Sequence, residues 1–212
     1  MENKKITLEE ATKIIEKARK TNDGEWIEHC YIASKVAGKL AEALGLDIEK
    51  AKCMGLLHDI GRKDGRMGLR HAINGYKYMN ELGYQDIARI CMTHSFFENT
   101  IEGCIGKFDM SEEEKSEIKQ YIENIEFDEY DRLIQLSDNL SSSTGVVTQE
   151  RRLVDVFFRY GFNENTKNNI YQRLNVQDEI EQKLGYPIYK LFPEVLEPLQ
   201  KEMLRDVVAF LK

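Results

Sequence analysis

The stretch that decides the fold is GLLHDIGRKDGR, residues 55–66, in which an apolar helical pattern leads directly into a histidine and an aspartate. Gly61 follows this doublet, and Arg62, Lys63 and Arg66 add positive charge in the next turn. A neighbouring His and Asp on a helix project about 100° apart, so they share a ligand sphere only where the site lies between them. A buried carboxylate needs a partner, and a divalent cation binds imidazole and carboxylate together. The stretch therefore predicts a buried metal site beside a basic loop.

The pattern on both sides of this stretch is helical almost throughout. Capping boxes at Thr7 with Glu10 and at Ser111 with Glu114 mark two helix starts. Apolar spacing and glycine stops predict helices over about 7–20, 23–44, 47–61, 70–82, 85–95, 111–124, 128–139, 149–160, 163–184 and 194–211. Loops are expected over 62–69 and 96–110, and the segment SSSTG at 141–145 is a seam within one domain. The sequence predicts a single all-α domain over residues 1–212.

Composition limits the classes of function. The 212 residues are 42% hydrophobic and 32% charged, with a net charge of −7, which is typical of a soluble globular protein and disfavours non-specific binding to nucleic acid or anionic membranes. No apolar run of about 18 residues suggests a membrane span, and the first residues show no apolar signal region. The four cysteines form no C-x-x-C pair, and three lie in apolar helical patterns. We therefore expect reduced thiols and a cytoplasmic protein.

Two further residues extend the predicted site. His29 lies on a helical stripe with Ala33, Val36 and Leu40, so its side chain is expected to face the core. Asp138 lies in an amphipathic helix among leucines and small serines, which suits the floor of a pocket. Each has an ordinary alternative: a hydrogen-bonded buried histidine in the first case, and an exposed aspartate beside an apolar stripe in the second.

The ordered set of His29, His58 with Asp59, and Asp138 resembles that of the HD-domain metal-dependent phosphohydrolases. GLLHDIGR is similar to the core motif of that family, and LIQLSDNL, residues 133–140, is similar to its final motif, an apolar helix ending in the metal-binding aspartate. The resemblance covers about residues 20–145. It implies an HD-domain helical bundle in which these four side chains bind a first divalent metal, with a C-terminal helical extension over about 146–212.

The resemblance also bears on the two remaining histidines. In the two-metal branches of the family, additional histidines lie between the doublet and the last aspartate, as His71 and His94 do here. With Asp59 bridging, they would hold a second ion, as in the bacterial HD-domain enzymes that split symmetric dinucleoside tetraphosphates. Alternatively, they bind substrate phosphate or move protons around one metal. The chain lacks the adjacent His-His pair and nearby GYP tripeptide of the cyclic-dinucleotide branch, which is therefore set aside.

The positive charge of the basic loop indicates a phosphorylated substrate. Arg62, Lys63, Arg66 and Arg70 are expected at the rim of the site, where they would bind phosphate oxygens. The implied reaction is hydrolysis of a phosphate ester or phosphoanhydride in a nucleotide-like molecule by metal-activated water, with Asp59, Arg62 and Lys63 as the catalytic residues. Asp59, His71 and His94 are candidates for the general acid.

Several points stay open at this level. Mixed imidazole and carboxylate ligands favour one or two ions of Fe, Mn, Co, Ni or Zn, with Mg as a further candidate. A mononuclear 5′-nucleotidase or dNTP hydrolase, or a non-catalytic regulatory domain that binds a nucleotide, are the alternatives. The extension carries aromatic residues that either shape a pocket wall or form the surface of a homodimer: Phe157, Phe158, Tyr160, Tyr171 and Tyr189.

Overall fold

The computed structural model describes residues 3–102, 104–162 and 164–195, which are helical over most of their length. The α-helices are α1 (Leu8–Thr21), α2 (Glu25–Leu44), α3 (Ile48–Leu57), α4 (Arg70–Leu82), α5 (Gln85–Thr93), α6 (Glu112–Asn124), α7 (Glu129–Asn139), α8 (Gln149–Tyr160) and α9 (Thr166–Leu184). Short 3₁₀ turns are η1 (Ile60–Asp64), η2 (Ile188–Lys190) and η3 (Pro193–Val195). The predicted all-α class is confirmed.

Local capping sets most of the helix boundaries. Both predicted capping boxes form, with the Thr7 and Ser111 side chains accepting backbone N–H groups at the starts of α1 and α6. Asp128 opens α7 in the same way. Gly45 and Gly83 end α2 and α4 in the left-handed region, at φ values of 72° and 86°, where glycine carries no Cβ penalty.

The helix expected over 47–61 is shorter than predicted, because α3 ends at Leu57 and the chain turns at the doublet. Asp59 has φ −100° and ψ 13°, outside the α-helical region, and η1 follows. The carbonyls freed at this helix end find side-chain partners: His58 Nδ1 lies 2.8 Å from the Gly55 oxygen, and Cys91 Sγ lies 3.4 Å from the Leu57 oxygen. His58 thus keeps helical dihedral angles as the C-cap of α3, and the turn begins at Asp59.

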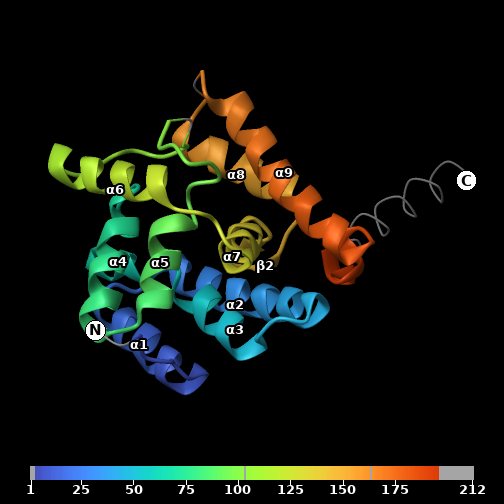
Figure 1. Cartoon of the computed structure of the whole chain (residues 1–212), viewed down its shortest axis with the longest axis horizontal. Helices are drawn as coiled ribbons and strands as arrows, with labels where there is room; N and C mark the ends of the chain where they lie inside the picture. The colour runs from blue at the N-terminus through green and yellow to red at the C-terminus, as the bar shows by residue number, and fades with distance from the viewer. Residues whose placement is uncertain (1–2, 103, 163, 196–212) are drawn as a thin grey trace, which may run out of the picture.

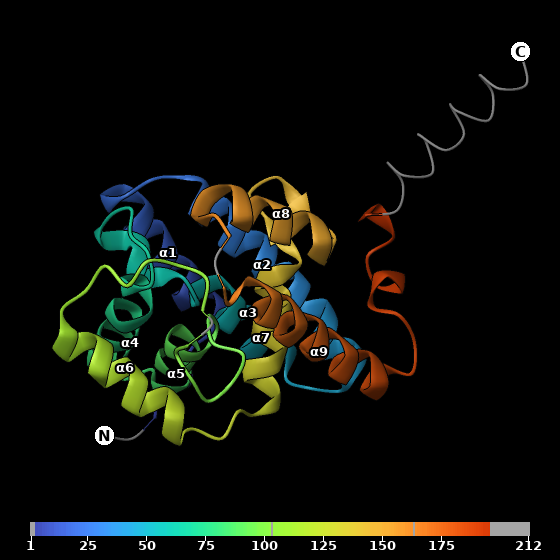
Figure 2. The same ribbon diagram turned by 90° about the horizontal axis from the view of Figure 1, so that it is seen from above.

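Helix α7 is the central element of the bundle. It contacts α2 and α3 on one side, α5 on another, and α8 and α9 on a third, and it lies in the middle of the molecule in both views (Figures 1 and 2). Helices α2 and α3 approach closely at Gly55, where an added Cβ would lie 2.8 Å from the Ala33 oxygen. The main core, which includes Leu40, Leu57 and Leu136, is buried among these helices and holds the central side chains in place.

The C-terminal extension packs onto the bundle through α8 and α9. Phe157 is buried in a small cluster with Leu153, whereas Phe158 is 88% exposed and Tyr171 is 55% exposed. The predicted seam at 141–145 is in part a two-stranded hairpin, with β1 (Ser141–Ser142) paired antiparallel to β2 (Gly145–Val146); the sequence pattern did not indicate these strands. Apart from its first two residues, which belong to η3, the helix predicted over 194–211 lies outside the described residues.

The state of the cysteines and the apolar character of the helices bear on the cellular location of the protein. The four cysteines are free thiols, three of them buried. None of the helices in the described ranges has both the length and the apolar character needed to cross a bilayer. The cytoplasmic location stays a prediction.

Candidate metal centre

Six predicted ligands come from five separate elements and meet near the centre of the bundle. His29 lies in the second turn of α2, His58 and Asp59 at the turn after α3, His71 in the first turn of α4, His94 at the end of α5, and Asp138 near the end of α7. The five residues other than Asp138 are each at most 5% exposed. The Asp138 side chain is 17% exposed, so it faces an opening.

One half of the cluster is formed by His29, His58 and Asp138. The Nε2 atoms of the two histidines are 3.3 Å apart, and Asp138 Oδ1 lies 2.9 Å from His29 Nε2 and 3.9 Å from His58 Nε2. These three residues each direct one ligand atom to a common point at a spacing suited to a metal ion. His29 and Asp138 are far apart in the sequence, and the packing of α2 against α7 brings them together.

The other half contains Asp59, His71 and His94. His71 Nε2 lies 3.0 Å from both His94 Nε2 and Asp59 Oδ1, and His94 Nε2 is 3.6 Å from the same oxygen. The second Asp59 oxygen, Oδ2, faces His58 at 3.9 Å. The two oxygens of Asp59 thus face different halves of the cluster, and His58, Asp59 and His94 form a second group with metal-ligand spacing.

The tautomers of three histidines follow from their outer hydrogen bonds. The Nδ1 atoms of His58, His71 and His94 face the carbonyl oxygens of Gly55, Gly68 and Ile90. Because a carbonyl oxygen only accepts, each Nδ1 carries the proton. In the neutral form of these three rings, each Nε2 then carries a lone pair, and these lone pairs point toward one another and toward carboxylate oxygens. This outer hydrogen bonding is the arrangement that orients metal-binding histidines.

Burial and charge favour the protonation states that metal binding requires at His58, His71 and Asp59. Burial lowers the pKa of His58 to about 3 and also lowers the pKa of His71. Burial opposes ionisation of Asp59, but the Arg62 guanidinium and the nearby imidazoles hold the pKa of that carboxyl well below its usual value. Neutral imidazoles and ionised carboxylates are the ligand forms.

The donor set fits a divalent cation. Asp59 Oδ1, which faces His71 and His94, is buried without a hydrogen-bond partner among the described residues. The ring nitrogen nearest to Asp59 Oδ1 is His71 Nε2, which carries a lone pair and therefore cannot donate a hydrogen bond. A cation supplies what this cluster of acceptors lacks, and mixed imidazole and carboxylate ligands suit transition metals.

The lowered histidine pKa predicts that the metal-free protein loses stability in mild acid. His58 has an unfolded pKa near 6.5 and a folded pKa of about 3, so the unfolded state binds more protons between these values. The free energy of unfolding should be highest above about pH 6.5 and fall as the pH decreases toward 3, by at most about 1.4 kcal/mol per pH unit for this group. Denaturant titrations in chelator at pH 7.5, 6 and 5 measure this. The slope should be smaller in His58→Gln, and equal slopes in both proteins would contradict the assignment.

The four predicted cations of the basic loop separate into two pairs. Arg62 donates from Nε to Asp59 Oδ2 at 2.7 Å and lines the cavity at the cluster, and Arg66 lines the same cavity. Lys63 instead pairs with Asp64 at 2.7 Å and lies over the ring of Tyr78, and Arg70 pairs with Glu114 at 3.4 Å. The structure does not bring Lys63 or Arg70 to the cavities at the cluster of candidate ligands, and their roles with substrate stay predictions.

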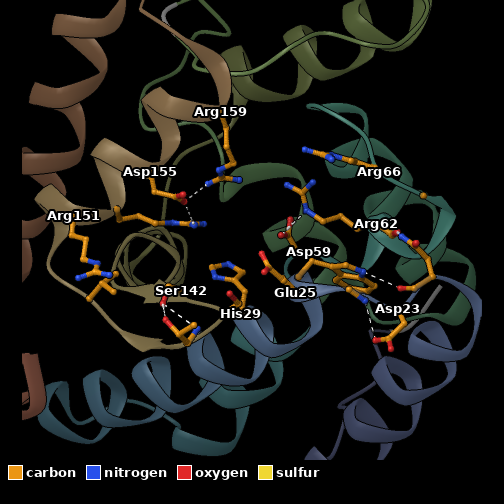
Figure 3. Close-up of a pocket in the computed structure, with 18 residues that line it drawn as sticks. Asp23, Glu25, His29, Asp59, Arg62, Arg66, Ser142, Arg151, Asp155 and Arg159 are labelled. Carbon is orange, nitrogen blue, oxygen red and sulfur yellow. Dashed lines mark hydrogen bonds and ion pairs between the residues drawn. The ribbon is translucent and has the colours of Figure 1, made fainter.

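An outer cavity of about 630 Å³ opens from the cluster, with His29 and Asp59 at its base. Figure 3 shows Arg62 and Arg66 on one side, and Arg151, Asp155 and Arg159 of α8 on the other. Asp23 and Trp26 also line this cavity. This volume is in the range of pockets that bind small molecules.

The arginines of α8 are the cavity residues that the sequence analysis did not identify. Arg152 donates to Asp138 Oδ1 at 3.2 Å, and Asp155 accepts from both Arg152 and Arg159, at 3.3 and 2.9 Å. The available signal was the spacing of Arg152, Asp155 and Arg159, at i, i+3 and i+7, which places them along one helix face. That spacing does not show which cavity the face covers.

Comparisons with known proteins agree with this geometry. Residues 26–143, more than half of the chain, match the family model of the HD domain, and this range contains all six clustered ligands. The chain is 36% identical over 74 residues to the uncharacterized protein MJ0778 of Methanocaldococcus jannaschii, an alignment covering 32% of this chain and 43% of that protein. It is also 36% identical over 72 residues to Ribonuclease Y 2 of Bdellovibrio bacteriovorus, covering 33% of this chain and 14% of that protein.

These alignments span less than half the length of either relative. No solved structure matches the chain. The family assignment therefore stands on the match over 26–143 and on the ligands that this range brings together. The chain belongs to the HD-domain family, which is typified by metal-dependent phosphohydrolases.

Proposed function

We propose that this protein hydrolyses a phosphate ester or phosphoanhydride bond in a small nucleotide-like molecule, with one ion in each half of the cluster. The observation that carries the proposal is the convergence of six ligands beneath a cavity lined with arginines, with Asp59 presenting one oxygen to each half. A metal site that opens into a cationic cavity suits a phosphorylated substrate. The branch that splits symmetric dinucleoside tetraphosphates is one source of candidates, although the relatives give that branch no support.

The residues of the chain would divide the work as follows. His29, His58 and Asp138 would hold one ion, His71 and His94 the other, and Asp59 would bridge them. A bound divalent ion supplies Lewis acidity and lowers the pKa of water at the site. Arg62 keeps Asp59 ionised and oriented through its 2.7 Å ion pair. Arg159 and Arg66 face the cavity, where they would neutralise phosphate oxygens.

The test is metal content followed by a phosphate-release screen. Elemental mass spectrometry of the purified full chain should find about two ions per chain. The screen covers mononucleotides, dNTPs, dinucleoside polyphosphates and a short RNA, each with Mn, Fe(II), Co, Ni, Zn or Mg, and chelated protein as control. Turnover of a small nucleotide that chelator removes supports the proposal. No bound metal and no turnover after reconstitution would leave a binding module, and preferred turnover of RNA would overturn the expectation that nucleic acid is not a partner.

Removing either histidine of the second half should lower the metal content selectively. His71→Ala and His94→Ala should each bind about one ion, because His29, His58 and Asp138 lie in the other half. His29→Ala is the matched variant for that half, and His29→Ala combined with His71→Ala should bind almost none. If the wild type itself holds one ion and His71→Ala still holds it, the mononuclear alternative is correct and His71 handles substrate or protons.

A further inference from the structure

Arg173 of α9 is a buried cation, and its hydrogen-bond and ring partners among the described residues are all neutral. It is 8% exposed. Its Nε donates to Asn169 Oδ1 at 2.7 Å, its Nη1 donates to Asn139 Oδ1, and its guanidinium lies 4.6 Å from the centre of the Phe97 ring. Among the described residues, no carboxylate lies within ion-pair distance of this side chain. The amides orient the guanidinium without neutralising it.

A buried charge without a counter-charge in contact costs free energy, and Asp138 attracts Arg173 only from beyond ion-pair distance. Burial lowers the pKa of Arg173 only to about 10, so the side chain stays charged at neutral pH. Its Nη2 nitrogen donates to no group in the described ranges, so part of its donor capacity is available. An anion bound beside it would remove the desolvation cost and accept these remaining hydrogen bonds.

A cavity suited to such an anion lies next to Arg173. It measures about 60 Å³, and four arginines line it: Arg62, Arg152, Arg159 and Arg173. The ligands His71, His94, Asp59 and Asp138 line it as well, and it shares Arg62, Arg152 and Arg159 with the outer cavity. Its volume corresponds to roughly four water-sized groups, which suits a single tetrahedral oxyanion and excludes a nucleoside.

We propose that this inner cavity binds the phosphate group that is cleaved, and that Arg173 is a phosphate-binding residue of the site. The inference rests on the proposed function and extends it to a residue outside the matched range 26–143. The metal ligands face one side of the phosphate, and Arg173 faces it from α9. The organic part of the substrate would lie in the outer cavity. The C-terminal extension therefore completes the site, because α8 and α9 supply three of the four arginines.

The experiment measures binding of inorganic phosphate to the full chain by calorimetry and by thermal shift, with and without bound Mn. Phosphate should raise the melting temperature of the wild type. Arg173→Gln should bind phosphate about 10- to 100-fold more weakly, since it removes a charge-assisted contact. Arg173→Lys keeps the charge, so its phosphate affinity should lie between those of the wild type and Arg173→Gln. Arg132→Gln is the matched control, because Arg132 is a half-buried arginine over the Phe127 ring that lines neither cavity.

Circular dichroism and the melting temperature without phosphate report whether Arg173→Gln folds. Arg159→Gln is a second variant at the same cavity, and its side chain is 39% exposed, so its folding is not at risk. It should weaken phosphate binding less than Arg173→Gln. Unchanged phosphate affinity in the folded Arg173 variants, or no binding by the wild type, would overturn the inference.

A kinetic readout separates this inference from the proposed function. With a substrate found in the screen, Arg173→Gln should raise KM and also lower kcat, whereas Arg132→Gln should change neither. If phosphate binding depends on Arg173 but the protein turns over no substrate, the anion site is supported and the proposed hydrolase function is refuted. Turnover in a protein whose phosphate affinity does not depend on Arg173 would support the hydrolase and refute the anion site at Arg173.

Discussion

Replacing Asp59 by alanine should abolish both metal binding and phosphate release, with a loss of about 10³-fold or more in kcat/KM. Asp59 is the residue whose two oxygens face the two halves of the cluster, at 3.0 Å from His71 Nε2 and 3.9 Å from His58 Nε2. No neighbouring side chain can replace both contacts. Asp59→Asn keeps the shape and removes the charge, so it should fail almost as completely.

Metal content and initial rates measure this effect. Asp64→Ala is the matched control, since Asp64 lies in the same turn but pairs with Lys63. That variant should keep normal metal content and turnover. The fold of Asp59→Ala should persist, because the core clusters do not depend on the Asp59–Arg62 pair. Wild-type rates in a folded Asp59→Ala protein would refute the metal assignment.

Replacing Gly61 by alanine should cost on the order of 3 kcal/mol or more in the free energy of unfolding. An added Cβ would lie 2.0 Å from the His71 oxygen and 2.6 Å from the Gly75 nitrogen, both in the backbone of α4. Neither atom can move without moving the helix. The turn η1 and α4 would therefore separate, and His71 would leave the cluster.

Thermal unfolding should show a decrease in melting temperature of about 6–12 °C, and metal content should fall as well. Gly24→Ala is the control, because its added Cβ meets only the Trp26 side chain, at 3.4 Å. It should shift the free energy of unfolding by less than about 1 kcal/mol. If Gly61→Ala is as stable as Gly24→Ala, the close packing of η1 on α4 is not what positions the doublet.

Much of the helical architecture could be read from the sequence, because its boundaries depend on nearby residues. Thr7 and Ser111 form capping boxes with residues three positions later, and Gly45 and Gly83 end helices through their own backbone conformation. The end of α3 was misplaced for the opposite reason. The backbone leaves the helix at Asp59, and the side chains of His58 and Asp59 meet histidines from distant parts of the chain, which local periodicity does not reveal.

The six ligand candidates were also identified from the sequence, since histidines and aspartates in apolar helical patterns are chemically conspicuous and their order resembles that of the HD domain. Their division into two halves was not. Which Asp59 oxygen faces which histidine depends on how five elements pack. The same holds for the loop cations: Lys63 and Arg70 have the same charge as Arg62 and Arg66, but Asp64 and Glu114 hold them elsewhere.

The sequence by itself determined the helical class, most helix boundaries and the types of the candidate metal-ligand residues, because each depends on local periodicity, capping or chemical identity. Only the tertiary structure decided that Arg152, Arg159 and Arg173 reach the cavity at the cluster of candidate ligands. Helical spacing assigns residues to a face, but α8 and α9 could present those faces to solvent or to the bundle. Their packing over α7, which buries Arg173 beside Asn139, places this charge at the site.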